Sequence, residues 1–312
     1  MDLSFVIPVY NEEKTLKELH QKMLENIGNK NYEIIFIDDG SNDNSYNILQ
    51  RIVREDENVK IIKFRRNFGK SAALQIGFDK AKGDIVFTLD ADLQDDPDEI
   101  PRFIKKINEG YDLVAGWKKH RKDPITKKIS SKIFNLITSI IFRLKLHDYN
   151  CGFKAYRNEV IKSIHIYGEL HRYIPALAKA KGYKICEIPI KHHKRRFGRS
   201  KYGLERFTRG FLDLLTVTMI TKYERSPLYL FGIGGLIISF IGFIVTLYLS
   251  IAKIFFGMPL SNRPLLFLGV LLIVVGVQLI SIGLLGEMIV YTSKREGKNK
   301  EKEINHKNSK PG

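Results

Sequence analysis

The sequence predicts an α/β fold with a mostly parallel sheet, followed by a helical hairpin long enough to cross a membrane. Three observations lead to this prediction. Apolar runs that read as buried strands alternate with helical patterns through residue 117. Pairs of aspartates follow two of these runs. Two long stretches near the C-terminus contain no charged residue at all.

The N-terminal part consists of strand runs that are apolar throughout and separated by helices. The predicted strands cover residues 3–10, 32–40, 59–64, 84–92 and 111–117. The predicted helices cover residues 12–27, 45–55, 71–81 and 97–109. This alternation is typical of a parallel sheet covered by helices on both faces. Because ligands of such sheets bind at the carboxyl ends of the strands, the residues that follow the strands are the first candidates for a site.

Acidic residues stand at two of these strand ends. Asp38 and Asp39 follow the second strand, and Asp90 and Asp92 follow the fourth. Two carboxylates that are two residues apart, where a strand turns, can point at one ion. Oxygen ligands favour a hard cation such as Mg²⁺ or Mn²⁺, partly hydrated and completed by diphosphate oxygens. The alternative is a solvated acidic loop without a ligand.

The glycine motifs that cradle phosphate are absent from the sequence. No G-x-G-x-x-G follows the first strand, where the chain reads VIPVYNEEKT, and no G-x-x-x-x-G-K-[ST] occurs. A nucleotide bound at this sheet would therefore need another way to offset its phosphate charge, and the predicted metal supplies one.

Residues 228–251 and 265–286 are uncharged stretches of 24 and 22 residues. Each can cross a hydrocarbon core, which takes about 20 residues, whereas the alternative is two buried helices of a soluble protein. Lys222 and Arg225 precede the first stretch, and a basic run from Lys294 follows the second. Positive charge stays on the cytoplasmic side. The prediction is a two-span membrane protein with its first 225 residues and both termini in the cytoplasm.

Two further features agree with the cytoplasm. The chain opens directly with a strand-like run, so no signal peptide is expected. The two cysteines, Cys151 and Cys186, form no C-x-x-C and fit a reducing compartment. The predicted domains are a catalytic domain over residues 1–202, a juxtamembrane amphipathic helix over 203–225, the hairpin over 226–291 and a basic disordered tail over 292–312.

The net charge of +17 is concentrated in two segments. Residues 117–145 contain nine Lys and Arg against one acid, and residues 191–209 contain eight against one. Localised positive charge predicts an anionic partner. Both segments also place apolar residues at helical spacing, which fits either a helix in the membrane interface or a packed core helix with a solvated basic face. The second segment leads almost directly into the first uncharged stretch, which favours the interface. Nucleic acid would explain the charge but not the hairpin, whereas a lipid phosphate at the bilayer explains both.

Four motifs occur in order: VIPVYNEE at 6–13, IDDGSNDNS at 37–45, RNFGKSAALQIGFDKAKGD at 66–84 and LDADLQDDP at 89–97. With them the chain resembles the family 2 glycosyltransferases, which have the GT-A fold. DYNCGFKAYR at 148–157, GRSKYG at 198–203 and the terminal hairpin resemble the polyprenyl-phosphate sugar transferases of that family, such as the dolichol-phosphate mannose synthases and the bactoprenol glucosyltransferases.

The resemblance implies a set of donor residues. Pro8, Tyr10 and Glu12 would line the nucleotide pocket, and Asp39 would bind the base with Asp38 beside it. Asp90 would lie near the donor sugar and diphosphate. Asp92 would be the main metal ligand, with Asp90 and Gln94 at the same site. Asp95, Asp96 and Pro97 are expected to end the loop and start the next helix, where acids suit the positive end of the helix dipole.

The resemblance also implies an acceptor site for the phosphate of a polyprenyl lipid, undecaprenyl or dolichyl. The residues that match are Arg121, Lys127, Ser131, Arg195, Arg196, Ser200 and Lys201. Relatives often carry Arg at the position of Lys127 and an acid at the position of Arg199. Lys offers a point charge instead of a bidentate fork, so these two positions depart from the family pattern. Relatives with a hairpin also associate through it, which leaves a homo-oligomer open.

The reaction implied is inverting transfer of a sugar from a nucleoside diphosphate, such as UDP-glucose or GDP-mannose. A phosphomonoester has a second pKa near about 6 and can attack without a base. Asp148 is the remaining candidate for a base or for orienting the acceptor, and its alternative is a loop acid. His147, His192 and His193 are expected at the surface or an interface. The rival functions are a processive polysaccharide synthase, although no Q-x-x-R-W motif occurs, and an inactive membrane-anchored nucleotide-binding protein.

Overall fold

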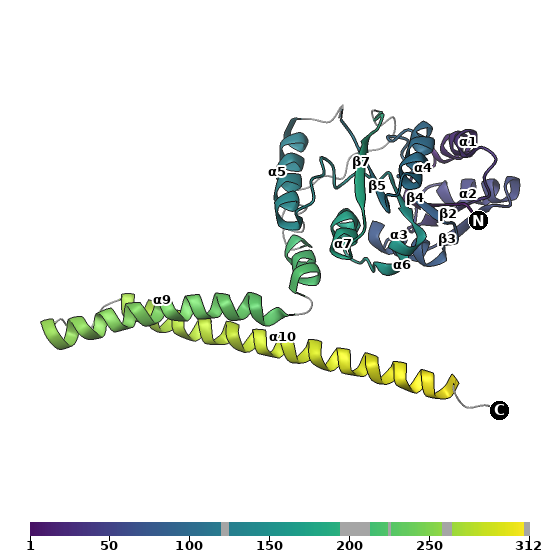
Figure 1. The fold of residues 1–312 in the computed structure, drawn as a ribbon. Coiled ribbons are helices and arrows are strands. Elements are labelled where there is room, and N and C mark those ends of the chain that lie inside the picture. The colour runs from purple at the N-terminus through teal and green to yellow at the C-terminus, as the bar shows by residue number, and fades with distance from the viewer. Residues whose placement is uncertain (120–124, 194–212, 224–225, 258–263, 309–312) are drawn as a thin grey trace. The chain divides into compact units, whose positions relative to one another are not determined.

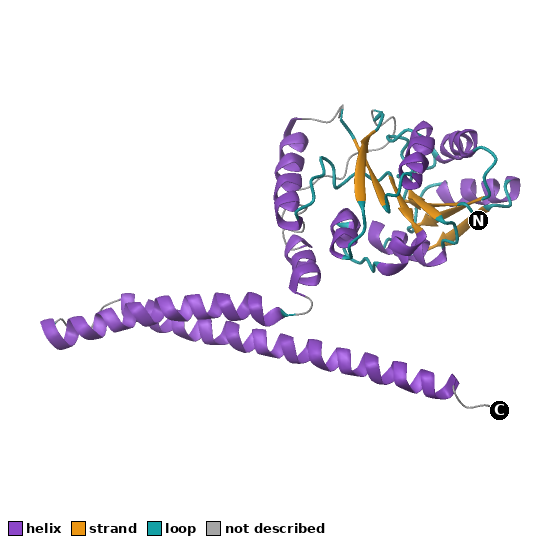
Figure 2. Ribbon diagram, in the orientation of Figure 1, coloured by secondary structure: helices purple, strands orange, loops and turns teal. Residues whose placement is uncertain are grey.

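The computed structural model describes residues 1–119, 125–193, 213–223, 226–257 and 264–308, and within these it describes no side chains for 125–133, 222 and 293–308. The chain divides into two compact units, Met1–Val217 and Thr218–Gly312. The first unit combines a sheet with helices and the second is helical in its described residues (Figures 1 and 2).

The first unit is built on a seven-stranded sheet with the strand order β3-β2-β1-β4-β6-β5-β7. The strands are β1 (Leu3–Val9), β2 (Tyr32–Asp38), β3 (Val59–Lys63), β4 (Ile85–Thr88), β5 (Leu113–Trp117), β6 (Lys154–Arg157) and β7 (Ile185–Pro189). Only β6 runs antiparallel, between β4 and β5. This confirms the predicted mostly parallel sheet. The sequence prediction did not include β6 and β7, because β6 is four residues long and contains Lys154 and Arg157.

Helices cover both faces of this sheet (Figure 1). They are α1 (Leu16–Ile27), α2 (Ser45–Glu55), α3 (Lys70–Lys80), η1 (Pro97–Glu99), α4 (Ile100–Asn108), α5 (Ile125–Phe142), α6 (Asn158–Ser163), η2 (Leu170–Arg172) and α7 (Ile174–Ala180). Phe5 and Ile7 of β1 belong to the core under α1, α2 and α4. Val6, between them, belongs to the core under α3, α6 and α7. The alternation of side chains along a strand therefore divides the core into two layers.

The carboxyl ends of the strands meet at one edge, where the loops that follow them are joined. The Asn11 backbone N–H donates to Ser41 Oγ at 3.0 Å, and the Asn42 N–H donates to Asn11 Oδ1 at 2.8 Å. The Glu12 N–H donates to Ser45 Oγ at 2.9 Å. These bonds link the loop after β1 to the loop after β2. Residues 12–15 belong to this loop, so the first helix begins later than the sequence predicts.

Gly40 lets two loops meet closely behind this edge. Its φ is +72°, in the left-handed region, and a Cβ built on it would lie 2.5 Å from the carbonyl carbon of Arg66. Gly77 has a packing role on α3, because its Cβ would lie 2.1 Å from Val6 Cγ1. Gly69, with φ +92°, precedes α3 at its N-cap. Gly69 thus has a role in the turn and Gly77 a role in packing.

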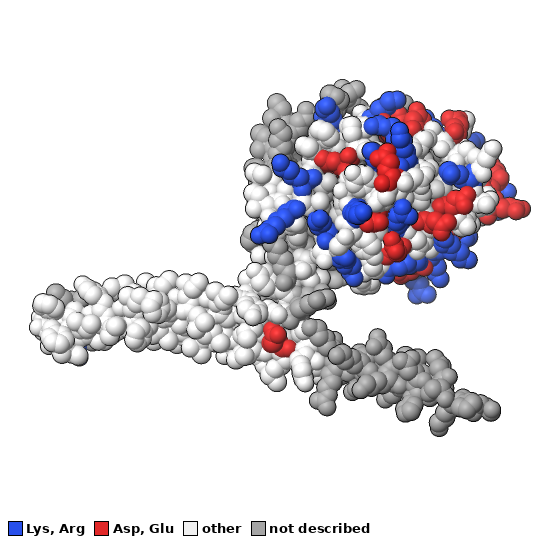
Figure 3. Space-filling view, viewed as in Figure 1, with Lys and Arg blue, Asp and Glu red and all other residues white. Residues whose placement is uncertain are grey.

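The second unit contains α9 (Pro227–Phe256) and α10 (Pro264–Asn308), preceded by the π-helical turn η3 (Met219–Tyr223). Both helices are long and apolar enough to cross a membrane. The face of this hairpin seen in Figure 3 is almost without charge, and large side chains such as Phe255 (75% exposed) and Phe267 (76% exposed) point outward. Exposed apolar surface of this extent is typical of contact with lipid.

Glycines allow the two hairpin helices to approach closely. A Cβ on Gly235 would lie 2.5 Å from the carbonyl oxygen of Gly276, and one on Gly242 would lie 2.6 Å from that of Gly269. Small residues at such crossings permit backbone contact between membrane helices. At the other end of the pair, Glu287 accepts a hydrogen bond from the Leu228 N–H at 3.4 Å. Negative charge there suits the N-terminus of α9.

The structure and the sequence differ at the C-terminal end. The sequence predicts a tail without regular structure from residue 292, whereas α10 continues to Asn308. Lys and Glu are good helix formers that extend a helix already begun. The predicted domain boundary at residue 202 lies outside the described residues. Of the predicted juxtamembrane helix, residues 213–223 are described, and they are helical.

Gly40→Ala tests the close approach of the two loops. Alanine there combines left-handed backbone strain with a clash against Arg66, so the free energy of unfolding should fall by about 3 kcal/mol. Gly28→Ala is the matched control, because Gly28 has φ +65° but no atom lies within 4 Å of the place that a Cβ would take. The control should lose about 1–2 kcal/mol. Urea unfolding of the detergent-solubilised chain measures both, and equal losses would contradict the packing argument.

Candidate active site

Asp39 joins the loop after β2 to the segment before α3. Its carboxylate accepts the Phe68 N–H at 2.7 Å and the Gly69 N–H at 3.0 Å. Burial raises the pKa of Asp39 although these two bonds oppose the shift. Asp38 beside it is fully buried and accepts the Ser41 N–H at 2.9 Å. The other carboxylate oxygen of Asp38 has no hydrogen-bond partner among the described residues.

The segment held by Asp39 leads directly to Lys70, whose ammonium forms an ion pair with Asp90. Lys70 is the first residue of α3, and Asp90 follows β4. Burial alone would raise the pKa of Asp90, but the charges of Lys70 and Lys118 outweigh it and hold that pKa well below its ordinary value. Asp90 is therefore a carboxylate at all physiological pH values.

Gly152 lies directly against the Asp90 carboxylate. A Cβ on Gly152 would lie 2.4 Å from Asp90 Oδ2, and the Gly152 carbonyl accepts the Thr88 hydroxyl at 2.8 Å. The loop before β6 and the loop after β4 are thus in contact at Asp90. Glycine at position 152 of the C-G-F motif is therefore explained by the lack of room for a side chain beside Asp90.

Asp92 and Gln94 lie on the tight loop that follows. The Gln94 N–H donates to Asp92 Oδ1 at 3.2 Å, and Leu93 between them has φ +55°. A left-handed Leu is uncommon and occurs where surrounding structure holds it. The loop is also fastened at its start, where Thr15 Oγ1 donates to the Ala91 carbonyl at 2.6 Å. Burial, followed by the charge of Asp90, raises the pKa of Asp92.

The residues present fit a divalent cation only in part. The described residues contain no group of three or more His, Cys, Asp and Glu side chains arranged to hold a metal. Asp90 and Asp92 can offer two carboxylates, and Lys70 already contacts one of them. Mg²⁺ and Mn²⁺ are often held by one or two carboxylates together with substrate phosphates and water. The acids therefore suit a cation that arrives with a diphosphate.

Asp95 and Asp96 differ from each other in what they contact. Asp96 accepts the Asp98 N–H at 3.2 Å and caps η1, as the sequence predicts for the start of this helix. Asp95 is instead 2% exposed and pairs with Lys118 at 2.9 Å. Asp95 therefore forms a buried ion pair and does not only end the loop before η1. Nothing in the sequence around Asp95 indicated that it pairs with Lys118.

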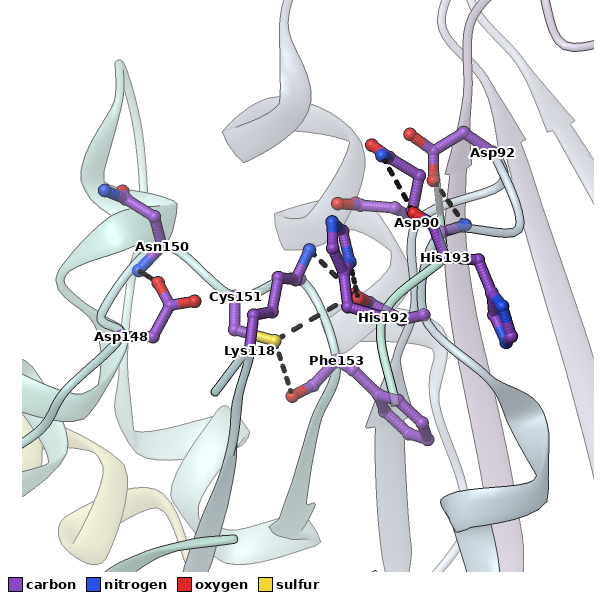
Figure 4. A network of polar contacts seen from close by, with 12 residues as sticks. Asp90, Asp92, Lys118, Asp148, Asn150, Cys151, Phe153, His192 and His193 are labelled. Atoms are coloured by element: carbon purple, nitrogen blue, oxygen red, sulfur yellow. Dashed lines mark hydrogen bonds and ion pairs between the residues drawn. The ribbon is translucent and has the colours of Figure 1, made fainter. Parts of the chain in front are cut away.

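His192 is the clearest error of the sequence prediction, which placed it at the surface or an interface. Its side chain is 4% exposed, and its Nδ1 lies 3.3 Å from Asp95 Oδ1 (Figure 4). His193 is 48% exposed and its Nε2 lies 3.0 Å from Asp96 Oδ2. His147, with a 63% exposed side chain, is at the surface as predicted and stacks on Trp117.

Other predicted donor residues are near this edge, but the structure does not test their roles. Pro8 is in β1, and Tyr10 and Glu12 are half-buried in the loop after it. Asp148 is buried and accepts the Asn150 N–H at 3.2 Å. In the view of Figure 4, Asp148 and Asn150 stand apart from Asp90 and Asp92, with Lys118 and Cys151 drawn between the two groups.

Most of the predicted acceptor residues lie outside the residues that the structure describes. Arg121, Arg195, Arg196, Ser200 and Lys201 are outside the described residues. Lys127 and Ser131 are in α5, where the structure describes the backbone alone. Their roles stay predictions.

Two basic side chains near Asp90 were missed by the sequence analysis. Lys154 is 3% exposed, its ammonium donates to the Cys151 carbonyl, and burial lowers its pKa to about 8. His171 Nδ1 lies 2.9 Å from Ser71 Oγ. Burial, followed by the charge of Lys70, holds the pKa of His171 well below its ordinary value. The one sequence sign was a lysine within the apolar run GFKAY.

Comparison with known proteins defines the family to which this fold and acidic edge belong. Residues 4–164 match the family described as "Glycosyl transferase family 2". The chain belongs to that family, and it is 38% identical over 303 residues to a dodecaprenyl-phosphate galacturonate synthase of Rhizobium johnstonii (strain DSM 114642 / LMG 32736 / 3841). The alignment covers 95% of this chain and 90% of that protein.

Solved structures share the fold of the first unit. The glucosyl-3-phosphoglycerate synthase from Mycobacterium tuberculosis in complex with Mn²⁺, UDP and glucosyl-3-phosphoglycerate gives a TM-score of 0.55 at 16% identity, over 70% of this chain and 79% of that one. The same enzyme with Mn²⁺, UDP-glucose and glycerol 3-phosphate gives 0.54 at 17% identity, with coverages of 70% and 79%. At these identities the likeness shows a GT-A-like fold.

Lys154→Met tests the buried lysine through pH. Between pH 8 and about 10 the unfolded chain keeps the Lys154 proton and the folded chain loses it, so stability from this group rises with pH. The variant lacks this gain, worth up to about 3 kcal/mol. The difference in unfolding free energy between wild type and variant should therefore change across this range. Lys17→Met, at an exposed lysine of α1, is the control, and its difference from wild type should stay constant across this range.

Proposed function

We propose that this chain transfers a sugar from a nucleoside-diphosphate sugar to a polyprenyl phosphate, with inversion at the anomeric carbon. The observation that supports this most directly is the gathering of Asp39, Asp90 and Asp92 on loops at one edge of the sheet. The same chain carries two apolar helices of membrane length. The 38% identical relative is named for a polyprenyl-phosphate product.

The donor would bind at the carboxyl edge of β1, β2 and β4. Asp39 would accept hydrogen bonds from the base, with Asp38, Pro8, Tyr10 and Glu12 around the nucleotide. Asp90 would orient the donor sugar beside Gly152, since only a glycine leaves room there. When the nucleotide-sugar binds, the Lys70 ammonium could leave Asp90 and contact an oxygen of the nucleotide-sugar instead. The sugar carried by the donor is part of the proposal to be tested.

The acceptor would approach from the basic segments at 117–145 and 191–209. Leu136, Ile137 and Ile140 of α5 are 61%, 42% and 67% exposed. Apolar side chains on a helix that begins with basic residues suit the boundary between headgroups and acyl chains. Arg121, Lys127, Ser131, Arg195, Arg196, Ser200 and Lys201 are proposed to hold the lipid phosphate.

The proposed step forms one bond and breaks one. An oxygen of the acceptor phosphate attacks the anomeric carbon, and the bond from that carbon to the diphosphate oxygen breaks with its electron pair leaving on the nucleoside diphosphate. The acceptor is already a dianion at neutral pH, so its attack requires no base. Asp148 would then orient the acceptor. Positioning and electrostatics carry most of the catalysis.

A bound Mg²⁺ or Mn²⁺ would offset the negative charge that develops on the departing diphosphate. Asp92 would hold it, with Asp90 and Gln94 at the same site. The chain's own part is to keep Asp92 aimed through the left-handed Leu93 and the Thr15 bond to Ala91.

We further propose that both termini and the first 225 residues are cytoplasmic, because Lys222 and Arg225 precede the first apolar stretch and the basic run from Lys294 follows the second. Association into a homo-oligomer stays a prediction. The rival functions, a processive synthase and an inactive binding protein, are outcomes of the donor experiment below.

Asp92→Asn tests the acidic site. Turnover at saturating Mn²⁺ should fall about 100-fold, because one ligand and its charge are lost while the shape is kept. Asp98→Asn, at an exposed acid of the same stretch, is the control and should leave turnover unchanged. Initial rates with and without a chelator measure the effect. Wild-type turnover by Asp92→Asn in the presence of chelator would rule out the metal assignment.

A donor panel tests the function as a whole. Purified protein in detergent is given polyprenyl phosphate, Mn²⁺ and one of UDP-glucose, GDP-mannose or a nucleotide-activated galacturonate, and the lipid product is weighed by mass spectrometry. We expect a single sugar added to the lipid phosphate with one preferred donor. Chains of several sugars would favour a processive synthase. Nucleotide binding without any glycosylated lipid would favour an inactive binding protein.

A further inference from the structure

The Asp95 carboxylate collects contacts from three separate segments of the chain. Lys118 Nζ, one residue beyond β5, lies 2.9 Å from its Oδ1. His192 Nδ1, three residues beyond β7, lies 3.3 Å from the same oxygen. The Cys151 thiol, in the loop before β6, lies 3.9 Å from Oδ2. Figure 4 shows the side chains of Lys118, Cys151 and His192 converging on one another.

The chain leaving β7 is fastened to the loop after β4 over two consecutive residues. His192 forms a backbone bridge with Asp95 as well as the side-chain contact. The His193 N–H donates to the Gln94 carbonyl at 2.8 Å, and its ring contacts Asp96 at 3.0 Å. Adjacent histidines thus meet adjacent aspartates. One residue before them, the Lys191 N–H donates to Glu99 at 3.2 Å.

These contacts lie at the beginning of the two basic segments, 117–145 and 191–209. Lys118 comes three residues before Arg121, and His192 comes three residues before Arg195. One buried carboxylate therefore fixes where both segments begin, relative to the loop that carries Asp92 and Gln94. A buried ion pair with added hydrogen bonds favours one arrangement, since breaking it leaves a buried charge without its partner.

The donor side of the same loop has attachments of its own. Thr15 Oγ1 holds the Ala91 carbonyl at 2.6 Å, and Lys70 holds Asp90. Asp96 caps η1 through the Asp98 N–H. Loss of the contact between Asp95 and His192 should therefore release the chain after β7 while Asp90 and Asp92 stay in place.

We propose that Asp95 is a positioning residue that aligns the two basic segments with the donor loop through Lys118 and His192. This rests on the proposed function, in which those segments receive the lipid phosphate. The acceptor side of the reaction depends on this contact, and the donor side does not.

The test compares His192→Leu with His192→Asn in the detergent-purified full chain. Leucine removes the partner of Asp95 but leaves the Asp95–Lys118 pair intact, whereas asparagine keeps a donor near the position of Nδ1. We expect His192→Leu to raise the KM for polyprenyl phosphate about tenfold and to leave the donor KM within about twofold. His192→Asn should recover most of the wild-type acceptor KM. Asp95→Asn should act in the same direction as His192→Leu if it folds.

Asp112→Asn is the matched control. Asp112 lies just before β5 and accepts the N–H of Lys184, just before β7, at 2.7 Å; it also pairs with Arg157 at 3.5 Å. It therefore joins the opposite ends of β5 and β7, the two strands that Lys118 and His192 follow. This variant should lower thermal stability without changing the acceptor KM. A purely structural role for His192 would reduce the active fraction, and therefore kcat, with both KM values unchanged. That result, or an equal rise in both KM values, would overturn the proposal.

Amide hydrogen exchange separates failure of this proposal from failure of the proposed function. In His192→Leu, exchange at the His193 N–H should quicken at least about tenfold while amides of residues 88–92 keep their wild-type rates. If wild type transfers no sugar to lipid, the function is wrong, and this exchange pattern still decides whether the contact exists. Unchanged exchange at His193 would overturn the proposal whatever the activity.

Discussion

Repulsion between carboxylates is the constraint on which this site depends. The mostly parallel sheet brings Asp38 at the end of β2, Asp39 after it, and Asp90, Asp92 and Asp95 after β4 to one edge. Like charges placed this close destabilise the fold unless something offsets them. Three of these acids are stabilised in different ways: Asp39 accepts two backbone N–H groups, Asp90 pairs with Lys70, and Asp95 pairs with Lys118.

These arrangements give the acids different chemical characters. The pKa of Asp90 is held low because lysine charges outweigh its burial, while burial and the Asp90 charge raise that of Asp92. Lys70, which contacts Asp90, could instead contact an oxygen of a bound nucleotide-sugar without leaving the site. The same edge is therefore organised for a ligand that brings both negative phosphates and a cation. This arrangement supports the proposed transfer of a sugar from a nucleoside diphosphate.

The sequence was sufficient for features that depend on local pattern. The alternation of strands with helices, the acids at strand ends and the two long apolar helices all follow from periodicity and composition, and the structure confirms them. Long-range pairings were out of reach. Nothing near His192 in the sequence indicates that it pairs with Asp95, 97 residues away, and Lys154 stands in a strand too short and too polar to recognise. Such pairs arise when loops from distant strands meet, so a single sequence does not predict them.

Binding of Mn²⁺ to the purified chain tests the central account most directly. Free Mn²⁺ is followed by electron paramagnetic resonance in the presence and absence of UDP or GDP. In the proposed site the protein would offer two carboxylates and the diphosphate would complete the coordination, so we predict weak binding alone and binding at least about tenfold tighter with one nucleotide. Equally tight Mn²⁺ binding without any nucleotide would show a complete protein site and contradict the account.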